Sequence, residues 1–534
     1  MKGRFYLDEG KVKSPPVPFT TYVKTNGKGK LWMNGLEKKL RDVMIDDAGI
    51  QGDIDKKSFS LTLEHQPDTL FKAQFKESYY EAGEPETRVY AKNIEGFWSS
   101  YRDTGENFGE IYIHKLYNLV RPNKLNLEMD LYYPKIPPVE GERRPLLLLF
   151  HSGSFYNGDK KETGFPQMGR YFAERGYVVA SINHRLGFLP TLAQFERAGY
   201  RALQDAHAAV CYLIDKANEF SIDTTLIFAG GTSAGAITAL NLAFMREENR
   251  PVATKENGII EWYKSSPLSE LVKNSKYKWL DISIRWYANL VSPNLGKINA
   301  VSGQNDRPFQ IKAVINMWGA VHTLEMLKNS RQTSILSFHS DTDSIVPHGH
   351  GYPFKGVFDP YVDEIINKCP WGIKHFAGIT RDLITEGNPL NELLSNPMDG
   401  SLQIHNKATS LGMRSELHLE KGGKHSLHLD RFDTLSDYFN DTILPATSRF
   451  LYEEIVGGKS IRFAQDEAWI EALNTDQTSE FYWLVEGGTI LNRQKKDKIK
   501  VMLFEDAPRH AVIATGKYKN GVEFRELLSG ADLY

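Results

Sequence analysis

The segment PLLLLFH at residues 145–151 is an uninterrupted apolar run that ends in a polar residue. A strand has this pattern when helices cover both faces of its sheet, because its side chains then have no solvent-facing side. Further apolar runs occur along the chain, several of them separated by helical patterns, at 177–183, 226–230, 311–319, 334–339 and 415–420. Strands that alternate with helices in this way predict a doubly wound, mostly parallel α/β sheet.

The two ends of the chain differ from this α/β pattern. Residues 1–108 hold short alternating segments bounded by Gly, Pro and Asp, which predict antiparallel strands and a β-rich N-terminal unit. Residues 457–534 hold short segments with Gly and Asn turns and predict a β-rich C-terminal unit. The α/β pattern occupies residues 109–456, and stretches at about 247–308 and 349–398 interrupt it. Because both follow candidate sheet elements, we expect cap insertions over a pocket at the carboxyl ends of the strands.

The charge composition argues against some classes of partner. Lys and Arg together number 65 and Asp and Glu 67, so no net charge attracts nucleic acid or an anionic membrane surface. The chain has no run of about 18 apolar residues, and we expect no transmembrane segment. Its start, MKGRFYLDEG, lacks the apolar core of a secretory leader. This start indicates either a cytoplasmic protein or a secreted protein whose leader has been removed.

Neither a metal nor a cofactor is predicted. The two cysteines, Cys211 and Cys369, are too few for a disulfide framework or a thiolate metal site, and Cys211 is expected to be a small core residue. The segment GDIDKK at 52–57 resembles a calcium loop but lacks its bidentate glutamate and its full ligand spacing. We therefore expect a small or neutral molecule as the partner.

One serine lies between two glycines where an apolar strand becomes a helix. The pentapeptide Gly231-Thr232-Ser233-Ala234-Gly235 follows LIFAG and opens a helical segment, which is the strand-turn-helix context of a G-x-S-x-G nucleophile elbow. Small neighbours are needed there because the turn is sharp, and the helix N-terminus directs its partial positive charge at the hydroxyl. Tight packing alone is the alternative interpretation, since the pentapeptide by itself is a modest signal.

A nucleophilic serine also needs a base, an orienting acid and hydrogen-bond donors for the developing oxyanion. The loop HSGSF at 151–155 follows a buried strand, and its small residues let backbone N–H groups approach a substrate oxygen. An ordinary turn at the end of a strand is the alternative for this loop.

The acid and the base have candidates after two other strands. Asp341 and Asp343 directly follow the strand SILSFH, and either can reach across the edge of the sheet. His425 follows a strand and two glycines, and His428 comes three residues later. The order Ser233, Asp343, His425 is the chain order that accompanies a G-x-S-x-G elbow.

Four segments, GTSAG, HSGSF, HSDTDSIVP and GGKHS, together resemble the α/β-hydrolase carboxylesterase and lipase superfamily. The resemblance covers about residues 125–245 and 310–455 and implies an α/β-hydrolase catalytic domain at 109–456. Asp343 rather than Asp341 matches the acid of the family pattern H-G-x-x-D-x-x-V-P. The site residues that the resemblance implies are the nucleophile Ser233, the base His425, the acid Asp343 and the oxyanion-hole N–H groups of Gly153, Ser154 and Ala234.

The sequence departs from this family in two places. The usual HGGGF is HSGSF here, so Ser152 and Ser154 carry side chains beside the expected oxyanion hole. The residues around His425, Lys424 and Ser426, also differ from the glycine-rich family pattern. Neither departure removes a group of the expected triad.

The expected activity is two-step acyl transfer from a carboxylic ester to water. We expect a small-molecule or polymeric ester as substrate, and aromatic residues in the insertions, such as Trp262 and Trp286, favour an apolar or aromatic acyl group. Three alternatives stay open. The same triad serves peptidases and amidases, although the chain lacks a blade-like repeat; the fold also occurs in non-catalytic binding proteins. Finally, the flanking units could bind a polymer through Trp98, Trp469 and Trp483, for which core packing is the simpler interpretation.

Overall fold

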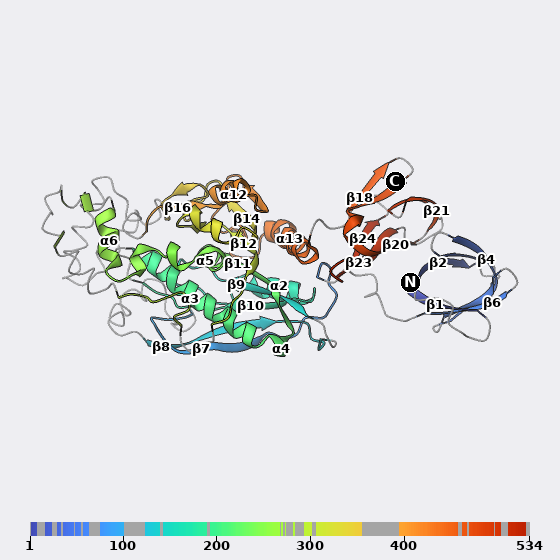
Figure 1. Cartoon of the computed structure of the whole chain (residues 1–534), viewed down its shortest axis with the longest axis horizontal. Coiled ribbons are helices and arrows are strands. Elements are labelled where there is room, and N and C mark those ends of the chain that lie inside the picture. The colour runs from blue at the N-terminus through green and yellow to red at the C-terminus, as the bar shows by residue number, and fades with distance from the viewer. Residues whose placement is uncertain are drawn as a thin grey trace. The chain divides into compact units, whose positions relative to one another are not determined.

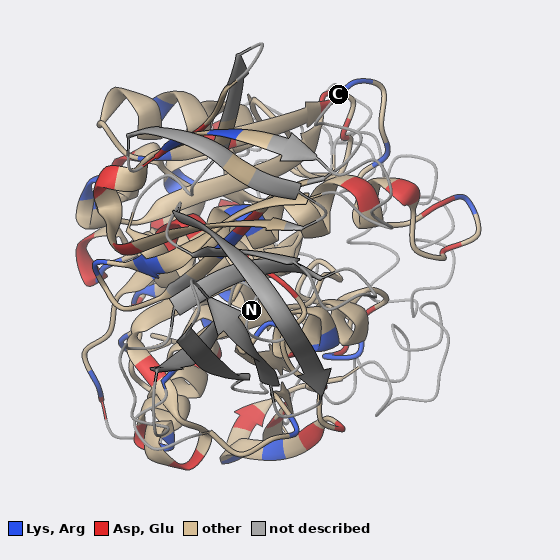
Figure 2. Cartoon of the chain, turned by 90° about the vertical axis from the view of Figure 1, so that its right-hand side faces the viewer, with Lys and Arg blue, Asp and Glu red and all other residues tan. Residues whose placement is uncertain are grey.

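The computed structural model describes residues 75–100, 123–138, 143–188, 193–266, 293–301, 306–354, 395–457 and 511–529, with isolated stretches between 269 and 282, the strands of residues 2–63, and most of 462–503. The insertion at about 349–398 lies largely outside these residues, as do Cys369 and Trp286. In the view of Figure 2, acidic and basic residues are interspersed along the described elements, as the near-balanced charge leads one to expect.

Eight strands form one mixed, mostly parallel sheet in the order β17-β14-β12-β11-β9-β10-β8-β7. Their bounds are β7 Glu86–Gly96, β8 Asn123–Tyr132, β9 Arg144–Phe150, β10 Val178–Ile182, β11 Ile222–Thr232, β12 Ile311–Met317, β14 Ser334–Ser340 and β17 Ser415–Glu420. All neighbouring pairs from β17 to β10 are parallel, whereas β8 pairs antiparallel with both β10 and β7. The predicted doubly wound α/β sheet is therefore confirmed.

Helices cover both faces of this sheet, and α3 and α5 run beside its central strands (Figure 1). The helices are α2 Phe165–Ala173, α3 Gln194–Asp215, α4 Ala217–Phe220, α5 Ala234–Phe244, α6 Gly258–Ser265, α12 Ser401–Ser410 and α13 Leu444–Val456. On one face, α3, α5 and α12 pack with Leu146, Leu148 and Phe150 of β9 in a single apolar cluster. Phe172 of α2 stacks edge-on against Tyr177, whose ring neighbours Phe228. Every residue of β9 is buried, and each buried leucine contributes roughly 2 kcal/mol of apolar transfer free energy.

Shorter elements connect this framework. A small antiparallel sheet consists of β13 Ala320–Val321, β16 Met398–Gly400 and β15 His350–Gly351. The 3-10 turns are η4 Glu247–Asn249, η5 Val252–Thr254, η6 Leu324–Ser330 and η9 Thr475–Gln477, and η8 Phe439–Ile443 is a π turn before α13. Among the described residues, no helix is both long and apolar enough to cross a membrane.

The chain divides by contacts into two compact units, Tyr80–Leu451 and a second unit made of Met1–Tyr79 with Tyr452–Tyr534. In the second unit, strands β1 to β6 close a barrel, and the C-terminal strands form one four-stranded and one three-stranded sheet. The strands are β1 Lys2–Leu7, β2 Val17–Val23, β3 Gly29–Met33, β4 Leu36–Asp46, β5 Gly49–Ile54, β6 Lys57–Leu63, β18 Arg462–Asp466, β19 Trp469–Leu473, β20 Thr478–Glu486, β21 Gly488–Lys495, β22 Lys498–Leu503, β23 Ala511–Tyr518 and β24 Glu523–Ser529.

The contact division does not coincide with the boundaries expected at 108 and 456. Strand β7 lies before residue 108 but pairs with β8 at the edge of the large sheet. An antiparallel edge strand has the same alternating pattern as a strand of a separate unit, so the sequence pattern does not distinguish the two. The assignment of an N-terminal and a C-terminal accessory unit stays a prediction.

Two of the three tryptophans considered for polymer binding are core residues. Trp98 and Trp483 are buried, and the indole N–H of Trp98 donates to the Tyr156 carbonyl at 2.7 Å. Trp469 is half-buried in β19. Trp98 and Trp483 therefore pack in the core, which is the simpler of the two interpretations of these tryptophans.

Candidate active site

Ser233 lies on the turn between β11 and α5 in a backbone conformation that L-residues rarely adopt, with φ 53° and ψ −115°. A non-glycine residue in this region is strained by roughly 1–3 kcal/mol and persists only where its surroundings hold it. Its N–H donates to the Met317 carbonyl at the end of β12, at 2.9 Å, and its carbonyl accepts from Ile237 in the first turn of α5. The turn is thus held from the neighbouring strand and from its own helix.

The two glycines of the elbow are required by close backbone contacts. A Cβ on Gly231 would overlap the Phe150 carbonyl and the Gly235 backbone, and a Cβ on Gly235 would overlap the carbonyls of Phe150 and His151. These contacts bring the start of α5 against the carboxyl end of β9. They also place the loop that begins at His151 beside the turn that carries Ser233.

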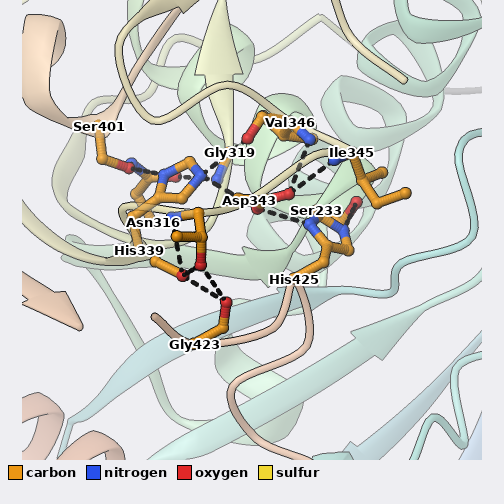
Figure 3. A network of polar contacts seen from close by, with 12 residues as sticks. Ser233, Asn316, Gly319, His339, Asp343, Ile345, Val346, Ser401, Gly423 and His425 are labelled. Atoms are coloured by element: carbon orange, nitrogen blue, oxygen red, sulfur yellow. Dashed lines mark hydrogen bonds and ion pairs between the residues drawn. The ribbon is translucent and has the colours of Figure 1, made fainter. Parts of the chain in front are cut away.

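Ser233, His425 and Asp343 form a continuous chain of polar contacts (Figure 3). The Ser233 Oγ atom lies 2.9 Å from Nε2 of His425, and Nδ1 of His425 lies 2.7 Å from Oδ2 of Asp343. The serine is 2% exposed, the Asp343 side chain is fully buried, and the His425 side chain is 18% exposed. The structure therefore brings these three sequence-predicted side chains to one point at the carboxyl edge of the sheet.

Asp343 is held as a carboxylate by three hydrogen bonds and by a close contact with a second histidine. Its Oδ1 atom accepts from the N–H groups of Ile345 at 2.8 Å and Val346 at 3.1 Å. Its Oδ2 atom faces His425 and also Nε2 of His339, at 3.2 Å. Burial alone would raise the pKa of Asp343, but the hydrogen bonds and charges of the two histidines bring it well below its usual range.

The other two candidates for the acid and the base lie elsewhere. Asp341 accepts from the N–H of Gly422 at 2.7 Å and so fastens the loop that precedes His425. His428 is buried, stacks on Trp318 with ring centroids 5.1 Å apart, and faces Glu162. Asp341 thus contacts the loop before His425, and His428 lies beside Glu162. Of these four candidates, only Asp343 and His425 connect to Ser233.

The loop after β9 contains three consecutive residues with positive φ values. Gly153, Ser154 and Phe155 have successive φ values of 107°, 56° and 58°. The Gly153 carbonyl accepts from the N–H groups of Tyr156 and Asn157 and closes the turn. Within the described part of the chain, the N–H groups of Gly153, Ser154 and Ala234 form no hydrogen bond. Ala234 begins α5, where the first N–H groups of a helix have no partner inside it.

Residues 129–355 match the BD-FAE family model, an α/β-hydrolase family. This match spans most of the large sheet, the elbow and the loop of Asp343. The large sheet thus has the fold of an α/β hydrolase, and residues 129–355 are similar to the BD-FAE family.

Individual relatives of this hydrolase are distant. Gut esterase 1 of Caenorhabditis elegans is 28% identical over 109 residues, which are 20% of this chain and 19% of the esterase. The non-reducing polyketide synthase ausA of Emericella nidulans is 21% identical over 329 residues, 57% of this chain and 12% of the synthase. The chain thus spans less than a fifth of the length of either relative. A structure of esterase 2 from Thermogutta terrifontis with propionate bound is 16% identical, covers 69% of this chain and 94% of its own, and superposes with a TM-score of 0.36.

Glu162 is a half-buried acid near the site that the sequence analysis missed. Its carboxylate accepts from the Ser152 N–H at 2.6 Å and from the Thr232 hydroxyl at 2.9 Å. Burial opposes ionisation of Glu162, but its contacts with His428 and Ser152 lower its pKa. The side chain therefore ties the loop after β9 to the residue before Ser233. Nothing in the segment GDKKETG distinguishes this glutamate from a surface residue, so the sequence carried no signal for it.

Three potential metal ligands lie close together, two of them on α3. His207, Cys211 and Asp306 each offer one ligand atom, and these atoms lie within 4.8 Å of one another. However, Nδ1 of His207 faces the Cys211 sulfur at 3.7 Å, whereas Nε2 faces Asp306 at 3.6 Å. One ion cannot bind both ring nitrogens of an imidazole, so this arrangement does not form a three-ligand site. Cys211 is buried, as expected of a core residue, and burial raises the pKa of its thiol.

The first insertion of the hydrolase contributes buried aromatic residues. Trp262 and Tyr263 of α6 are both buried, and the Trp262 N–H donates to Glu196 of α3 at 3.3 Å. Glu196 also lines a cavity of about 30 Å³, together with Phe155, Phe195 and Ile237. A small space with apolar and polar residues in its wall therefore adjoins both the loop after β9 and the helix that follows Ser233.

Proposed function

We propose that this hydrolase cleaves carboxylic esters through an acyl-enzyme intermediate. In this mechanism Ser233 is the nucleophile, His425 the general base and Asp343 the orienting acid. The proposal is carried by one observation, the chain of contacts from Ser233 Oγ through His425 to Asp343 on a positive-φ turn. A strained, buried serine hydroxyl within hydrogen-bond distance of an oriented imidazole is the arrangement that activates a nucleophile.

The first half-reaction forms the acyl-enzyme. The Asp343 carboxylate can only accept hydrogen bonds, so it selects the His425 tautomer with a proton on Nδ1 and a lone pair on Nε2. That lone pair takes the proton of Ser233 as its oxygen attacks the ester carbonyl. The imidazolium is then stabilised by Asp343 and gives its proton to the alcohol that leaves.

The second half-reaction releases the carboxylic acid. Water enters in place of the alcohol, and His425 takes one of its protons as the water oxygen attacks the acyl carbonyl. His425 then gives this proton to Ser233 Oγ as the bond between Oγ and the acyl carbon breaks. In both steps the carbonyl oxygen becomes an oxyanion, for which we assign the N–H groups of Gly153, Ser154 and Ala234 as donors. Removal of one such donor typically lowers kcat by about 100- to 1000-fold.

The substrate that we propose is a small-molecule or polymeric carboxylic ester with an apolar or aromatic acyl group. The supporting observation is the apolar wall of Phe155, Phe195 and Ile237 next to the loop after β9. A panel of p-nitrophenyl acetate, octanoate and benzoate tests this assignment. We expect kcat/KM to differ among the three esters, and equal values would contradict an apolar acyl site.

The decisive experiment compares reaction types in one preparation. The protein is labelled with a fluorophosphonate, the modified peptide is identified by mass spectrometry, and hydrolysis of p-nitrophenyl esters is compared with that of peptide p-nitroanilides. We expect the label on Ser233 and turnover of the esters. A label on Ser233 with turnover of the anilides alone would indicate a peptidase or amidase. Absence of any label, together with no turnover of either the esters or the anilides, would indicate a binding protein.

A further inference from the structure

We propose that His339 is a positioning residue for Asp343. It is held by Ser401 and Asn316 as the neutral tautomer that donates from Nε2, so that it supports the carboxylate without competing with His425 for a proton. This inference rests on the proposed function, in which His425 is the general base and Asp343 the orienting acid.

Two histidines share one carboxylate oxygen. Oδ2 of Asp343 lies 2.7 Å from Nδ1 of His425 and 3.2 Å from Nε2 of His339. His339, at the end of β14, is fully buried. A proton taken up by His339 would form an ion pair with Asp343 and weaken the stabilisation of a charged His425. The site therefore requires a means of keeping His339 neutral.

Hydrogen bonds determine the protonation of His339 from the Nδ1 side. The Asn316 Oδ1 atom accepts from the Gly319 N–H at 2.9 Å, which fixes the orientation of the amide. Its NH2 group therefore donates to Ser337 Oγ and to Ser401 Oγ, both at 3.0 Å. Since Ser401 accepts from Asn316, its own proton is free to point at Nδ1 of His339, 2.6 Å away. Nδ1 thus acts as an acceptor and carries no proton (Figure 3).

The Nε2 side gives the same tautomer independently. Besides Asp343, Nε2 of His339 faces the Val346 carbonyl at 3.1 Å. A carbonyl and a carboxylate can only accept, so Nε2 must carry the proton. One end of the ring therefore donates to Val346 with Asp343 Oδ2 3.2 Å away, and the other end accepts from Ser401. A second proton on Nδ1 would meet the Ser401 hydroxyl proton head-on.

The surroundings of His339 also disfavour its charged form. The titratable side chains that face it are Asp343, His425 and His348, whose ring centroid lies 6.4 Å away. Burial lowers the pKa of His339, and it outweighs the Asp343 carboxylate, which acts in the opposite direction. Ser401 and Asn316 are themselves fully buried, so water does not replace their hydrogen bonds. Because His339 stays neutral, the negative charge of Asp343 can stabilise a positively charged His425.

The direct test measures the tautomer in the intact protein. In protein labelled with 15N-histidine, the nitrogen chemical shifts distinguish a protonated from an unprotonated ring nitrogen, and the His339→Gln variant identifies the His339 signals. We expect an unprotonated Nδ1 and a protonated Nε2 from about pH 5 to about pH 9. A wild-type His339 that titrates in this range, or that carries its proton on Nδ1, would overturn the inference. Because this readout does not involve turnover, it stands apart from any failure of the proposed esterase activity.

The functional test removes the Ser401 hydroxyl. In Ser401→Ala, Nδ1 of His339 is free to take a proton, so we expect the loss of kcat/KM for a p-nitrophenyl ester to grow toward acid pH. We expect this loss to be larger at about pH 6 than at about pH 9. Ser401→Thr keeps a hydroxyl in the same place and should restore the wild-type profile. A uniform loss at every pH in both variants would mean that Ser401 only packs against its neighbours, which would contradict the role assigned to its hydroxyl.

Discussion

The serine side and the acid side of the candidate site are constructed in different ways. Ser233 is held by the backbone, because Gly231 and Gly235 let β9 and α5 meet at the turn. Asp343 is held by three hydrogen bonds to its two oxygens and by the nearby ring of His339. The first side depends on the space that atoms occupy, and the second depends on which atoms carry protons. Steric changes should therefore act on the elbow at every pH, whereas the acid side should respond to pH.

The largest effect is expected at the elbow itself. Ser233→Ala removes the nucleophile and should lower kcat for p-nitrophenyl acetate by a factor on the order of 10⁶. Ser410→Ala, at the end of α12, is the matched control and should leave kcat unchanged, because its hydroxyl donates only to the Lys407 carbonyl. Steady-state kinetics of the two variants measure the difference. Activity that survives in Ser233→Ala would remove the serine from the proposed mechanism.

Asp343→Asn tests the acid side with a smaller expected effect. The asparagine NH2 group would face Nδ1 of His425 and favour the wrong tautomer, so we expect kcat to fall by about 10⁴-fold. Asp341→Asn is the control, because its side chain can still accept from the Gly422 N–H. Comparison of kcat for the two variants decides between the adjacent aspartates. An equal loss in both would assign the effect to the loop as a whole.

Gly235→Ala tests the steric side of the comparison. A methyl group there would overlap the Phe150 carbonyl, and we expect a loss of stability of about 3 kcal/mol, at the upper end of overpacking effects. Gly349→Ala is the matched control, because a Cβ at Gly349 has no neighbour within 4 Å. Thermal unfolding followed by circular dichroism should give the same difference at acid and neutral pH. A strongly pH-dependent difference would show that the elbow is not held by sterics alone.

The contrast also explains which parts of the fold and of the site could be predicted from the sequence. The sheet was predictable, because strands such as β9 are buried along their whole length and are apolar at each position. The elbow was predictable because its steric demand is local and requires glycine at two fixed positions. The choice of Asp343 over Asp341 rested on resemblance to a family, since both follow the same strand.

The hydrogen-bond network behind Asp343 could not be predicted in the same way. Asn316 and Ser401 are 85 positions apart and meet only in the folded chain. A serine or asparagine in a sequence does not indicate which donor it will face, so their effect on His339 needed the structure. Glu162 was missed for the same reason, because its partner Thr232 is 70 positions away. The edge strand β7 was assigned to a separate unit because its alternation is common to any half-exposed strand.

The smallest effect is expected at a second carboxylate, that of Glu196. Glu196 accepts from the Asn396 N–H at 2.9 Å and from the Trp262 N–H at 3.3 Å. These neutral donors do not offset desolvation, so burial raises its pKa to about 7. The pKa of Asp343 is shifted in the opposite direction by the hydrogen bonds and charges of His339 and His425. The two acids thus differ in whether histidines face them.

The sign of the pH effect follows from this raised pKa. Below about pH 4.5, Glu196 is protonated in both the folded and the unfolded chain and carries no penalty. As pH rises toward 7 the unfolded chain loses its proton first, so the folded state becomes less stable relative to it. Glu196→Gln should remove this penalty and raise the free energy of unfolding by about 2 kcal/mol above pH 7, with little change near pH 4.5. Denaturation at both pH values, with the exposed Glu261→Gln as control, measures the difference. A stabilisation that is equal at both pH values would mean that the pKa of Glu196 does not differ between the folded and the unfolded protein.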